Sequence, residues 1–377
     1  MPVQAIAFKQ EVLIVAQKRK RLILVALGLA ALTAMAVAAS GAFARTSSPG
    51  AAHAAKLTHL DVGLALIPPK MTFVAFYVAK DKGFFAKNGL DVNLQGFDGG
   101  VKSLRGVASG SVDVGCTSAD DVITAATQGG GVKAFWSYAM PLDTTLVADQ
   151  SVQTIADLKG KKIGITDPGG FADVQVRAVL AQAHISPGDA QIISLPNRAA
   201  LLPALVSGRI NAAPFHADDG YAAEEKDSAL HSVIGIYKSL PSWWYGACTA
   251  TSDYLKSNAD NLRRFTTAMM QASRWMYSNP GQTISIGTKY TQETEGVVTH
   301  AYNFLAKARG WTVNTGLQKD RVLKTMQYEY GLKSIPRIPA YNEVVDISIA
   351  NSALKKLGVF PRPKKVHGKL VYAKGWF

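Results

Sequence analysis

Two pairs of adjacent aspartates, Asp120-Asp121 and Asp218-Asp219, have the residue type and placement that could do chemistry. Each pair closes one copy of a repeated stretch, S-G-S-V-D-V-G-C-T-S-A-D-D at 109–121 and S-G-R-I-N-A-A-P-F-H-A-D-D at 207–219. Two carboxyl groups facing each other across a cleft could serve as acid and base, as in glycosidases. A structural role is the alternative, because the helix dipole stabilises a carboxylate at a helix start. No familiar catalytic motif accompanies the pairs, so we expect binding rather than catalysis, and no cofactor.

The repeat predicts two similar α/β halves in tandem. Each copy has an amphipathic helical run, a Ser-Gly stop, a short apolar strand and a polar loop that begins another helix. The register also holds upstream, where Asp91 falls on Asp189. Ser118 is expected to cap the helix after the first copy, with Asp121 completing a capping box. Open α/β sheets bind ligands outside the carboxyl ends of their strands, so two such loops would face each other across a cleft.

These elements predict an α/β fold with two lobes, each a mixed sheet flanked by helices, and two hinge crossings. The first part of lobe 1 is expected at 57–148, lobe 2 at 149–245, and a second, mostly helical part of lobe 1 at 246–352. Within them we expect strands at 112–116 and 209–213, one helix over 72–87 and a last helix over 341–357.

The N-terminus has the pattern of a secretory signal. The basic cluster 18–21 precedes the apolar run 22–39, and Ala42-Phe43-Ala44 is a small-x-small cleavage site. We expect residues 1–44 to be a cleaved signal peptide and 45–56 a flexible leader. The alternative is an uncleaved anchor, since the apolar run is nearly long enough to span a bilayer. No cysteine lies near the cleavage site, so a lipoprotein is not expected, and the predicted location is the periplasm.

The formal charge of +14 is concentrated at the ends of the chain. Residues 353–377 carry seven basic and no acidic side chains, whereas residues 45–352 carry 29 basic against 26 acidic. Nucleic-acid binding proteins usually carry a basic stripe on a folded face, so no nucleic-acid partner is expected. The tail is interpreted as a solvated extension, with attraction to an anionic membrane surface as the alternative.

The two cysteines, Cys116 and Cys248, lie in strand-like surroundings of small residues. An exported protein with two cysteines forms one disulfide or none, and we expect buried free thiols. No Cys/His spacing fits a zinc site, and no metal is expected.

Several residues are candidates for ligand contact. The glycines Gly169-Gly170 at a helix start would expose backbone N–H groups to an anion, although from these residues alone a plain βα turn is the favoured interpretation. Phe73 begins a helix beside a loop, and the aromatic run at 243–245 precedes the second crossing, where one or two side chains could line the cleft. His216 lies in the repeat loop, which raises it above an ordinary capping residue.

The chain resembles the periplasmic solute-binding proteins of ABC importers. The similarity is greatest to the branch that serves nitrate, taurine, alkanesulfonates and thiamine-pyrimidine precursors. It is carried by Y-V-A-K-D-K-G-F-F-A-K-N-G-L-D-V (77–92), V-A-S-G-S-V-D-V-G (107–115), D-L-K-G-K-K-I-G (157–164) and C-T-A-T-S-D-Y-L (248–255). The resemblance implies the two-lobed type II periplasmic-binding-protein fold, in which a ligand in the cleft closes the lobes about a hinge.

The resemblance also implies where the ligand binds. The contacts fall on the first strand-end loop, on 118–120, on 169–171 and on the loop 215–218. Together with the aromatic run, the candidate site is Pro69, Met71, Phe73, Ser118, Ala119, Asp120, Gly169, Gly170, Phe171, Phe215, His216, Asp218, Trp243 and Trp244.

The implied function is capture of a small organic solute and delivery to the permease subunits of an importer, with the protein as a monomer. Helix starts at Ser118 and Gly170 favour an anion, whereas Asp120 and Asp218 suit an amine or aminopyrimidine. A sulfonate, a taurine-like solute, an aromatic carboxylate and a thiamine-pyrimidine precursor all remain open. The alternatives are an exported enzyme that uses Asp120 or Asp218, and a ligand sensor coupled to a membrane receptor.

Overall fold

The computed structural model describes residues 56–361, 364–366 and 369–371. The expected signal peptide, nearly all of the leader and much of the basic tail lie outside the described residues.

The first lobe is built on a five-stranded sheet in the order β2-β1-β3-β10-β4. Strands β1, β2 and β3 are parallel, and β10 lies antiparallel between β3 and β4. The strands are β1 (Thr58–Leu64), β2 (Leu90–Gly96), β3 (Val114–Ser118), β4 (Val132–Ala139) and β10 (Gly246–Thr251). Their connections hold η1 (Met71–Phe73), α2 (Val74–Asp81), α3 (Phe84–Lys87), α4 (Gly100–Ser109) and α5 (Ala119–Thr127).

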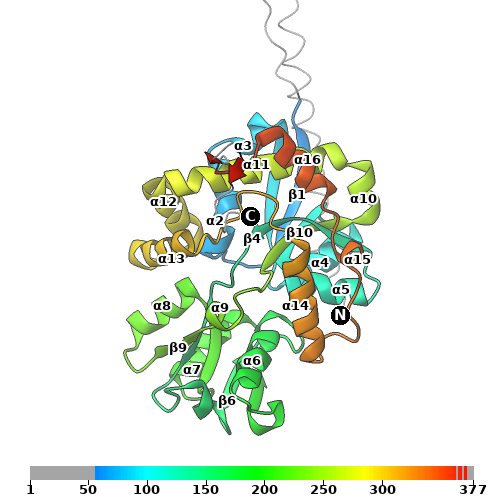
Figure 1. Cartoon of the computed structure of the whole chain (residues 1–377). Coiled ribbons are helices and arrows are strands. Elements are labelled where there is room, and N and C mark those ends of the chain that lie inside the picture. Colours follow the sequence, from blue (N-terminus) through cyan, green and yellow to red (C-terminus); the bar gives the residue numbers. More distant parts are fainter. Residues whose placement is uncertain (1–55, 362–363, 367–368, 372–377) are drawn as a thin grey trace, which may run out of the picture. The chain divides into compact units, whose positions relative to one another are not determined.

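The second lobe repeats this plan in the order β7-β6-β8-β5-β9. Here β6 is parallel to β7 and β8, and β5 lies antiparallel between β8 and β9. The strands are β5 (Thr144–Ala148), β6 (Lys162–Ile165), β7 (Gln191–Ser194), β8 (Ala212–His216) and β9 (His231–Gly235). The helices are η2 (Ile155–Leu158), α6 (Phe171–Gln182), η3 (Pro187–Asp189), η4 (Arg198–Ala200), α7 (Leu201–Val206), α8 (Ala217–Lys226) and α9 (Ile236–Ser239). Figure 1 shows this lobe below the first one.

The chain crosses between the lobes twice, as expected, but the first crossing lies earlier than predicted. The expected boundary after residue 148 would place strand β5 in lobe 1, yet β5 pairs with β8 and β9 in the second sheet. The first crossing is therefore at 140–143 rather than near 149, and the second is at 240–245. Alternation alone could not show which sheet a short strand joins.

The two halves are equivalent in structure, which confirms the duplication. Ser118 and His216 are both N-caps with extended backbones, at φ −67°, ψ 154° and φ −63°, ψ 156°. The strand before each cap, β3 or β8, receives an antiparallel neighbour that comes from a crossing. The first strand lies two residues later than predicted and the second three residues later, because the polar end of each copy continues the strand to the helix cap without a loop.

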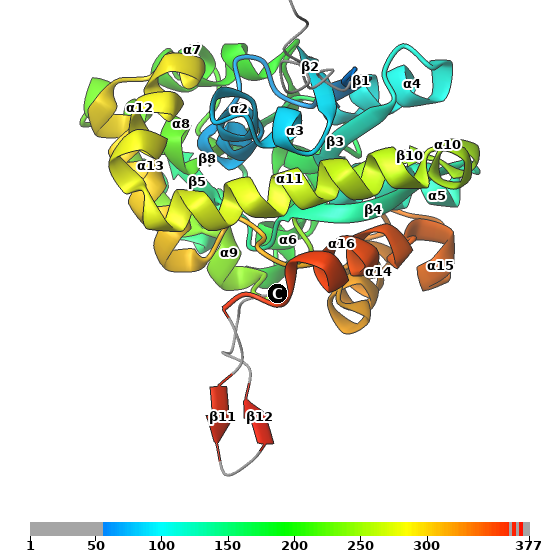
Figure 2. The same ribbon diagram turned by 90° about the horizontal axis from the view of Figure 1, so that it is seen from above.

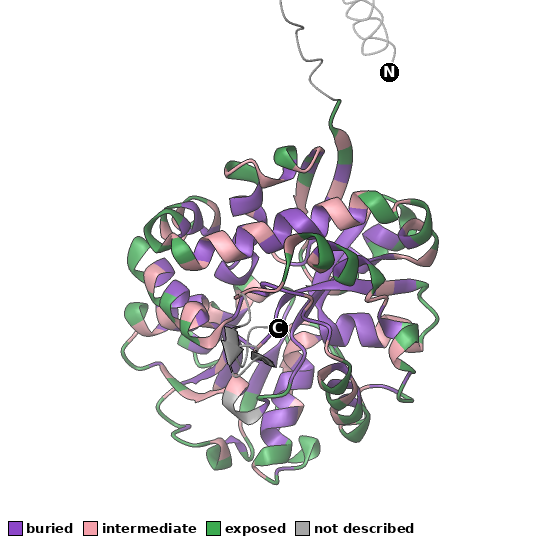
Figure 3. Cartoon of the chain, turned by 45° about the horizontal axis from the view of Figure 1, so that its top comes forward, coloured by how far each residue is buried: buried purple, intermediate pink, exposed green. Residues whose placement is uncertain are grey.

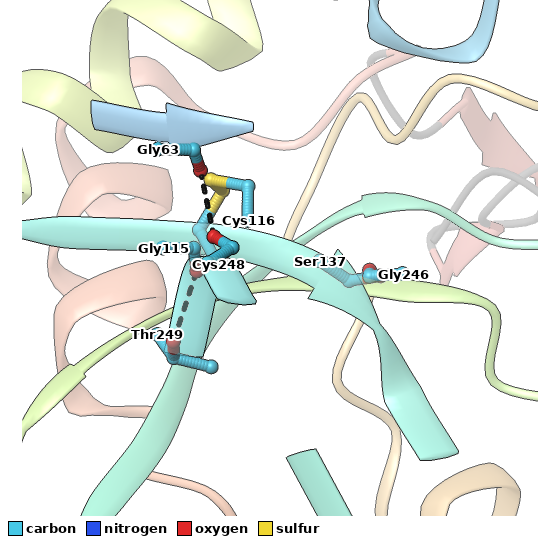
Figure 4. The surroundings of a disulfide bond; sticks show 8 residues. Gly63, Gly115, Cys116, Ser137, Gly246, Cys248 and Thr249 are labelled. Atoms are coloured by element: carbon cyan, nitrogen blue, oxygen red, sulfur yellow. Dashed lines mark hydrogen bonds between the residues drawn. A yellow bond between two sulfur atoms is a disulfide. The ribbon is translucent and has the colours of Figure 1, made fainter. Parts of the chain in front are cut away.

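The expectation of free thiols is wrong. Cys116 on β3 and Cys248 on β10 form a disulfide between directly paired residues of neighbouring strands. Both residues are fully buried, and Figure 4 shows them beside Gly63, Gly115 and Thr249. Sequence spacing could not show that the second crossing returns the chain beside β3.

Helices from the C-terminal region complete the first lobe. These are α10 (Ser252–Ser257), α11 (Ala259–Ser278), α12 (Pro280–Thr291), α13 (Glu295–Ala308), α14 (Lys319–Gly331), α15 (Tyr341–Val344) and α16 (Ser348–Leu357). Helix α11 buries Leu262, Phe265, Met269 and Met276 on one stripe and packs against α2 and α16 (Figure 2). A short hairpin of β11 (Lys364–Val366) and β12 (Lys369–Val371) follows.

Two predicted helices are divided. The helix expected over 72–87 is interrupted at Gly83, whose φ of 70° ends α2 and starts α3. The helix expected over 341–357 consists of α15 and α16, because Val345 has an extended backbone.

Figure 3 shows the sheet strands buried and the outer helix faces exposed. Among the residues that the structure describes, every helix is too short or too polar to cross a bilayer.

Candidate functional site

A cavity of about 120 Å³ lies between the two lobes, which we call the inner cavity. The loops that follow β1, β2, β6 and β7 and the carboxyl ends of β3 and β8 all contribute to it, as expected for parallel strands. The lining residues are Ala65, Leu66, Ile67, Phe73, Asp98, Gly99, Gly100, Val101, Lys102, Thr117, Ser118, Asp121, Tyr138, Thr144, Thr166, Asp167, Gly170, Phe171, Ala172, Gln175, Pro196, Asn197, Arg198, Leu201, Pro214, Phe215, His216 and Tyr245.

Aromatic rings form much of the cavity wall. Phe171 from the second lobe stacks on Tyr245 in the second crossing, with ring centroids 5.5 Å apart. Phe171 also stacks on His216, with ring centroids 6.0 Å apart. The ring centroids of Phe73 and Tyr138, both of the first lobe, are 4.8 Å apart. Ring faces from both lobes can enclose a planar or apolar body.

Asp121 is the carboxyl group that the first repeat places at the cavity. The hydroxyls of Thr117 and Ser118 donate to its Oδ2 at 2.6 and 2.7 Å. Burial raises the pKa of Asp121, although the two hydroxyl groups act in the opposite direction. Helix α4 starts against the same oxygen, since a Cβ on Gly100 would lie only 1.8 Å from Oδ2. The expected capping box does not form, because the Ser118 hydroxyl donates to Asp121 and makes no cap bond to a backbone N–H.

His216 belongs to a polar network that joins both lobes and both crossings. Its Nδ1 lies 2.9 Å from Oδ1 of Asp143 in the first crossing and 3.2 Å from the hydroxyl of Tyr245 in the second. Thr72 of the first lobe donates to the other oxygen of Asp143. Burial lowers the pKa of His216, but the charge of Asp143 outweighs this effect and the pKa is raised. Burial likewise raises the pKa of Asp143, yet the charge and hydrogen bond of His216 hold it below its usual value.

The crossings also hold the helices that begin at the repeat loops. The backbone N–H of Ala119, the first residue of α5, donates to the carbonyl of Tyr245 at 2.8 Å. The equivalent N–H of Ala217, at the start of α8, donates to the carbonyl of Asp143 at 2.8 Å. Any rotation of a crossing therefore moves a wall of the cavity.

A second cavity of about 380 Å³, the outer cavity, adjoins the first. An ion cluster on its wall joins the lobes: Lys70 Nζ lies 2.5 Å from Asp219 and 2.8 Å from Glu293. Arg198 Nη1 lies 2.5 Å from the other oxygen of Asp219. Lys70 is only 3% exposed, and burial lowers its pKa, but Asp218 and Asp219 reverse the effect and raise it. Burial raises the pKa of Asp219, yet Arg198 and Lys70 bring it below the usual value.

Six of the predicted site residues line the inner cavity: Phe73, Ser118, Gly170, Phe171, Phe215 and His216. The other eight line neither of these two cavities: Pro69, Met71, Ala119, Asp120, Gly169, Asp218, Trp243 and Trp244.

The two acids singled out by the repeat are directed elsewhere. Asp218 accepts the backbone N–H of Met71 at 3.1 Å, and burial raises its pKa to about 6. Asp120 is 1% exposed and has no hydrogen-bond partner for its carboxyl oxygens among the described residues. Burial and the neighbouring Asp121 raise the pKa of Asp120 well above its usual value. On a helix, neighbours point in different directions, so the repeat could not show which acid of each pair faces the cleft.

The two tryptophans pack against α14. Trp243 meets Tyr328 edge to face at 5.8 Å, and the backbone N–H of Trp244 donates to Thr325 at 2.8 Å. The third aromatic of the run, Tyr245, is the one that reaches the cavity. Both tryptophans are therefore core residues of the first lobe.

Sequence reasoning missed several lining residues. Gly99 and Gly100 begin α4 after β2, and the reasoning applied to Gly169-Gly170 would have selected them. Arg198 begins η4 after the end of β7, so its place after a strand would likewise have selected it. No local signal marked Gln175, which faces the cavity from within α6. The residues that the structure describes contain no group of three or more acidic, histidine or cysteine side chains that could hold a metal.

Comparison with known proteins gives a family. A model of the family described as "NMT1/THI5 like" matches residues 70–283, more than half of the chain. The chain belongs to this NMT1/THI5-like family. A protein named as a binding protein, YtlA of Bacillus subtilis (strain 168), is 25% identical over 298 residues, which cover 77% of this chain and 88% of YtlA.

Two further similarities extend the comparison. The formylaminopyrimidine-binding protein of Halalkalibacterium halodurans is 24% identical over 225 residues, covering 58% of this chain and 66% of the relative. The alkanesulfonate-binding protein SsuA of Xanthomonas axonopodis pv. citri, solved with MOPS, has a TM-score of 0.64 at 18% identity, with 79% of this chain and 98% of SsuA covered. This NMT1/THI5-like chain thus has the two-lobed periplasmic-binding-protein fold that its sequence predicted, and the three proteins compared above are named as binding proteins.

Proposed function

We propose that this protein is the extracytoplasmic substrate-binding component of an ABC importer. It captures a small organic solute by closing its lobes and delivers the solute to the permease. The observation that carries the proposal is the inner cavity, which both lobes and the second crossing line together. A site shared in this way is complete only when the lobes are closed, so ligand binding and closure are linked.

The lining favours a planar ring that carries a hydrogen-bond donor. The rings of Phe171, Tyr245 and Phe73 supply apolar faces. Both hydroxyl donors to Asp121 use the same oxygen, so Oδ1 is the oxygen that a ligand N–H would approach. Of the solutes left open by the sequence, an amino-substituted pyrimidine fits this wall better than a bare sulfonate or taurine. The name of the formylaminopyrimidine-binding relative is in keeping with this choice.

Export to the periplasm without a lipid anchor is part of the proposal. The disulfide between Cys116 and Cys248 supports it, because disulfides persist in oxidising compartments. We also propose a monomer that does not bind nucleic acid. The enzyme alternative loses its basis, since Asp120 and Asp218, the acids it would use, line neither cavity.

A thermal-shift screen of the protein from Arg45 onward tests the proposal. The panel is 4-aminopyrimidines, alkanesulfonates, taurine, nitrate and aromatic carboxylates. A solute that binds only the folded state stabilises it by about 2.7 kcal/mol at a hundredfold excess over Kd. We expect an aminopyrimidine to raise the Tm without being consumed, and Asp121→Asn to abolish the shift. Asp189→Asn, an exposed aspartate outside both cavities, is the matched control. A shift that Asp121→Asn leaves intact, or turnover of the solute, would contradict the proposal.

A further inference from the structure

The inner and outer cavities are adjoining parts of the cleft between the lobes. Ile67, Asp98, Asn197, Arg198 and Phe215 line both of them. The inner part measures about 120 Å³ and the outer part about 380 Å³. A ring held by the inner aromatics therefore lies next to the outer part, with Arg198 at the boundary.

The walls of the two parts differ in chemistry. The outer cavity lacks the aromatic stack and adds charged side chains, Lys70, Asp219, Lys226 and Glu293. Small or aliphatic residues, among them Ala199, Leu202 and Ala222, complete its wall. The outer part thus suits a flexible polar chain better than a second ring.

The charged side chains that line the outer cavity are equal in number, Lys70, Arg198 and Lys226 against Asp98, Asp219 and Glu293. They are not all paired within the wall. Asp219 is held by Lys70 and Arg198, and Glu293 by Lys70. Asp98 instead pairs with Lys102, outside this cavity, at 3.2 Å. Lys226, exposed on α8, has no ion pair among the described residues, so it can bind an anionic occupant.

Arg198 lies between the two cavities, and one of its N–H groups makes only a weak hydrogen bond that a ligand could replace. Its Nη1 is bound to Asp219, but its Nη2 reaches the carbonyl of Pro68 only at 3.4 Å, beyond the usual range of N–H···O distances. A ligand oxygen at the junction would offer Nη2 a shorter, charge-assisted bond.

We propose that the natural solute has two parts, a planar ring in the inner cavity and a flexible tail that passes Arg198 and ends in an anionic group in the outer cavity. The inference rests on the proposed function and specifies the ligand of the same cleft. The anionic group is a carboxylate, sulfonate or phosphate, which share the oxygen acceptors that Arg198 and Lys226 would bind.

Calorimetry with two probes on the mature protein tests the inference. The probes are 4-amino-2-methylpyrimidine and the same ring with a 5-propanoate tail. A hydrogen bond to a charged group contributes about 1.5 kcal/mol or more, so the tail should tighten Kd about tenfold. The neutral propanamide analogue should recover less than half of this gain in free energy.

Ala199→Trp separates the two parts of the site. Ala199 is exposed and lines only the outer cavity, so a tryptophan there should remove the gain from the tail and leave the Kd of the bare ring unchanged. Val206→Trp, at an exposed residue outside both cavities, is the matched control and should retain the gain.

Lys226→Glu provides a second test that does not depend on filling the cavity. It should weaken the tailed probe alone, whereas Lys256→Glu, an exposed change on α10, should weaken neither probe. Equal Kd values for ring and tailed ring, or a gain that survives both Ala199→Trp and Lys226→Glu, would overturn the inference and leave the proposed function standing. Binding of neither probe would overturn the inference together with the choice of an aminopyrimidine ring, and the thermal-shift screen would then decide the proposed function separately.

Discussion

Lys70 in the first lobe and Asp219 in the second lobe form an ion pair, with 2.5 Å between the buried ammonium and a half-buried carboxylate. The pair lies where the lobes meet. Beside it, the backbone N–H of Met71 donates a hydrogen bond to the carboxylate of Asp218. Helix α13 adds another contact between the lobes, because the ring of His300 stacks on that of Tyr221 in α8 with centroids 4.1 Å apart. The structure thus shows the two lobes joined by specific contacts.

Lys70→Met should weaken closure. Removal of one partner from a buried pair costs about 3–5 kcal/mol, and we expect about 1–3 kcal/mol here because Asp219 keeps Arg198. Calorimetry should show a weaker Kd for the solute, and small-angle scattering a larger radius of gyration without it. Lys289→Met, which breaks an exposed pair with Asp81, is the control and should change little. Equal behaviour of the two variants would show that Lys70 does not hold the lobes.

The pair of His216 and Asp143 should make stability depend on pH. The folded-state pKa of His216 is raised above 6.5, so its contribution is complete below 6.5 and is lost as pH rises through the folded value. The pKa of Asp143 is lowered below 3.8, so its contribution is present above 3.8 and is lost in stronger acid.

The variant His216→Gln/Asp143→Asn removes both charges. Between pH 3.8 and 6.5 both charges stabilise the wild type, so the Tm of the variant should lie furthest below that of the wild type near about pH 5–6. This difference in Tm should narrow toward about pH 9. Thermal unfolding across this range measures the gap. The exposed pair His59 and Asp91 offers a matched control in His59→Gln/Asp91→Asn, which should open no comparable gap. A gap in the buried variant that does not change with pH would refute the charged pair.

Glu329 on α14 should act in the opposite sense to an ordinary carboxylate. Burial and then the charge of Asp120 raise its pKa well above 4.5, so the neutral form is favoured in the folded state. Stability from this group is present below 4.5 and is lost as pH rises toward the folded value. Glu329→Gln should therefore gain in Tm relative to wild type as pH increases.

Thermal melts of Glu329→Gln between about pH 5 and pH 8 check this slope. Glu343→Gln gives the contrast, because the hydrogen bond from Arg337 lowers the pKa of Glu343. A Glu329→Gln variant whose Tm falls relative to wild type with rising pH would show that Glu329 is ionised in the folded protein.

The double variant Cys116→Ala/Cys248→Ala should be less stable than the oxidised protein. The bridge spans a sequence separation of 132, and disulfides contribute about 2–4 kcal/mol, chiefly by restricting the unfolded chain. Denaturant unfolding measures the loss. Thiol titration of the exported wild type in denaturant should find no free thiol, and two free thiols would contradict the bridge.

Gly100→Ala should disturb the site from the side of α4. Its Cβ would lie 1.8 Å from Oδ2 of Asp121 and 1.9 Å from the hydroxyl of Thr117, so both acceptor and donor must shift. Overpacking of this kind costs about 1–3 kcal/mol, and the solute should bind more weakly. Gly188→Ala is matched to it, because a Cβ there meets nothing within 4 Å. Calorimetry should give a weaker Kd of the solute for Gly100→Ala than for Gly188→Ala. Equal Kd values for the two variants would show that Asp121 does not contact the solute.

The sequence predicted the fold through its internal repeat but the site only in part. The repeat places a helix cap and two acids in each half, and Ser118 and His216 indeed line the cavity. Which acid faces the cleft depends on the rotation of a helix, so the repeat alone does not distinguish Asp120 from Asp121, the one that lines the cavity. The aromatic run had the same ambiguity, and Tyr245 rather than Trp243 reaches the cavity. The disulfide and the sheet of β5 depend on long-range pairing that a local pattern does not contain.

The duplication has a consequence for how specificity can evolve. Asp121 and Asp219 occupy the same position of the repeat, yet the first lines the inner cavity and the second is paired with Lys70 of the opposite lobe. Equivalent carboxylates of the two halves thus lie in different surroundings. Under the proposed function, substitutions at Asp121 would alter the preference of the inner cavity while the ion pair of Asp219 with Lys70 is preserved, so ring recognition can change without loss of a contact between the lobes.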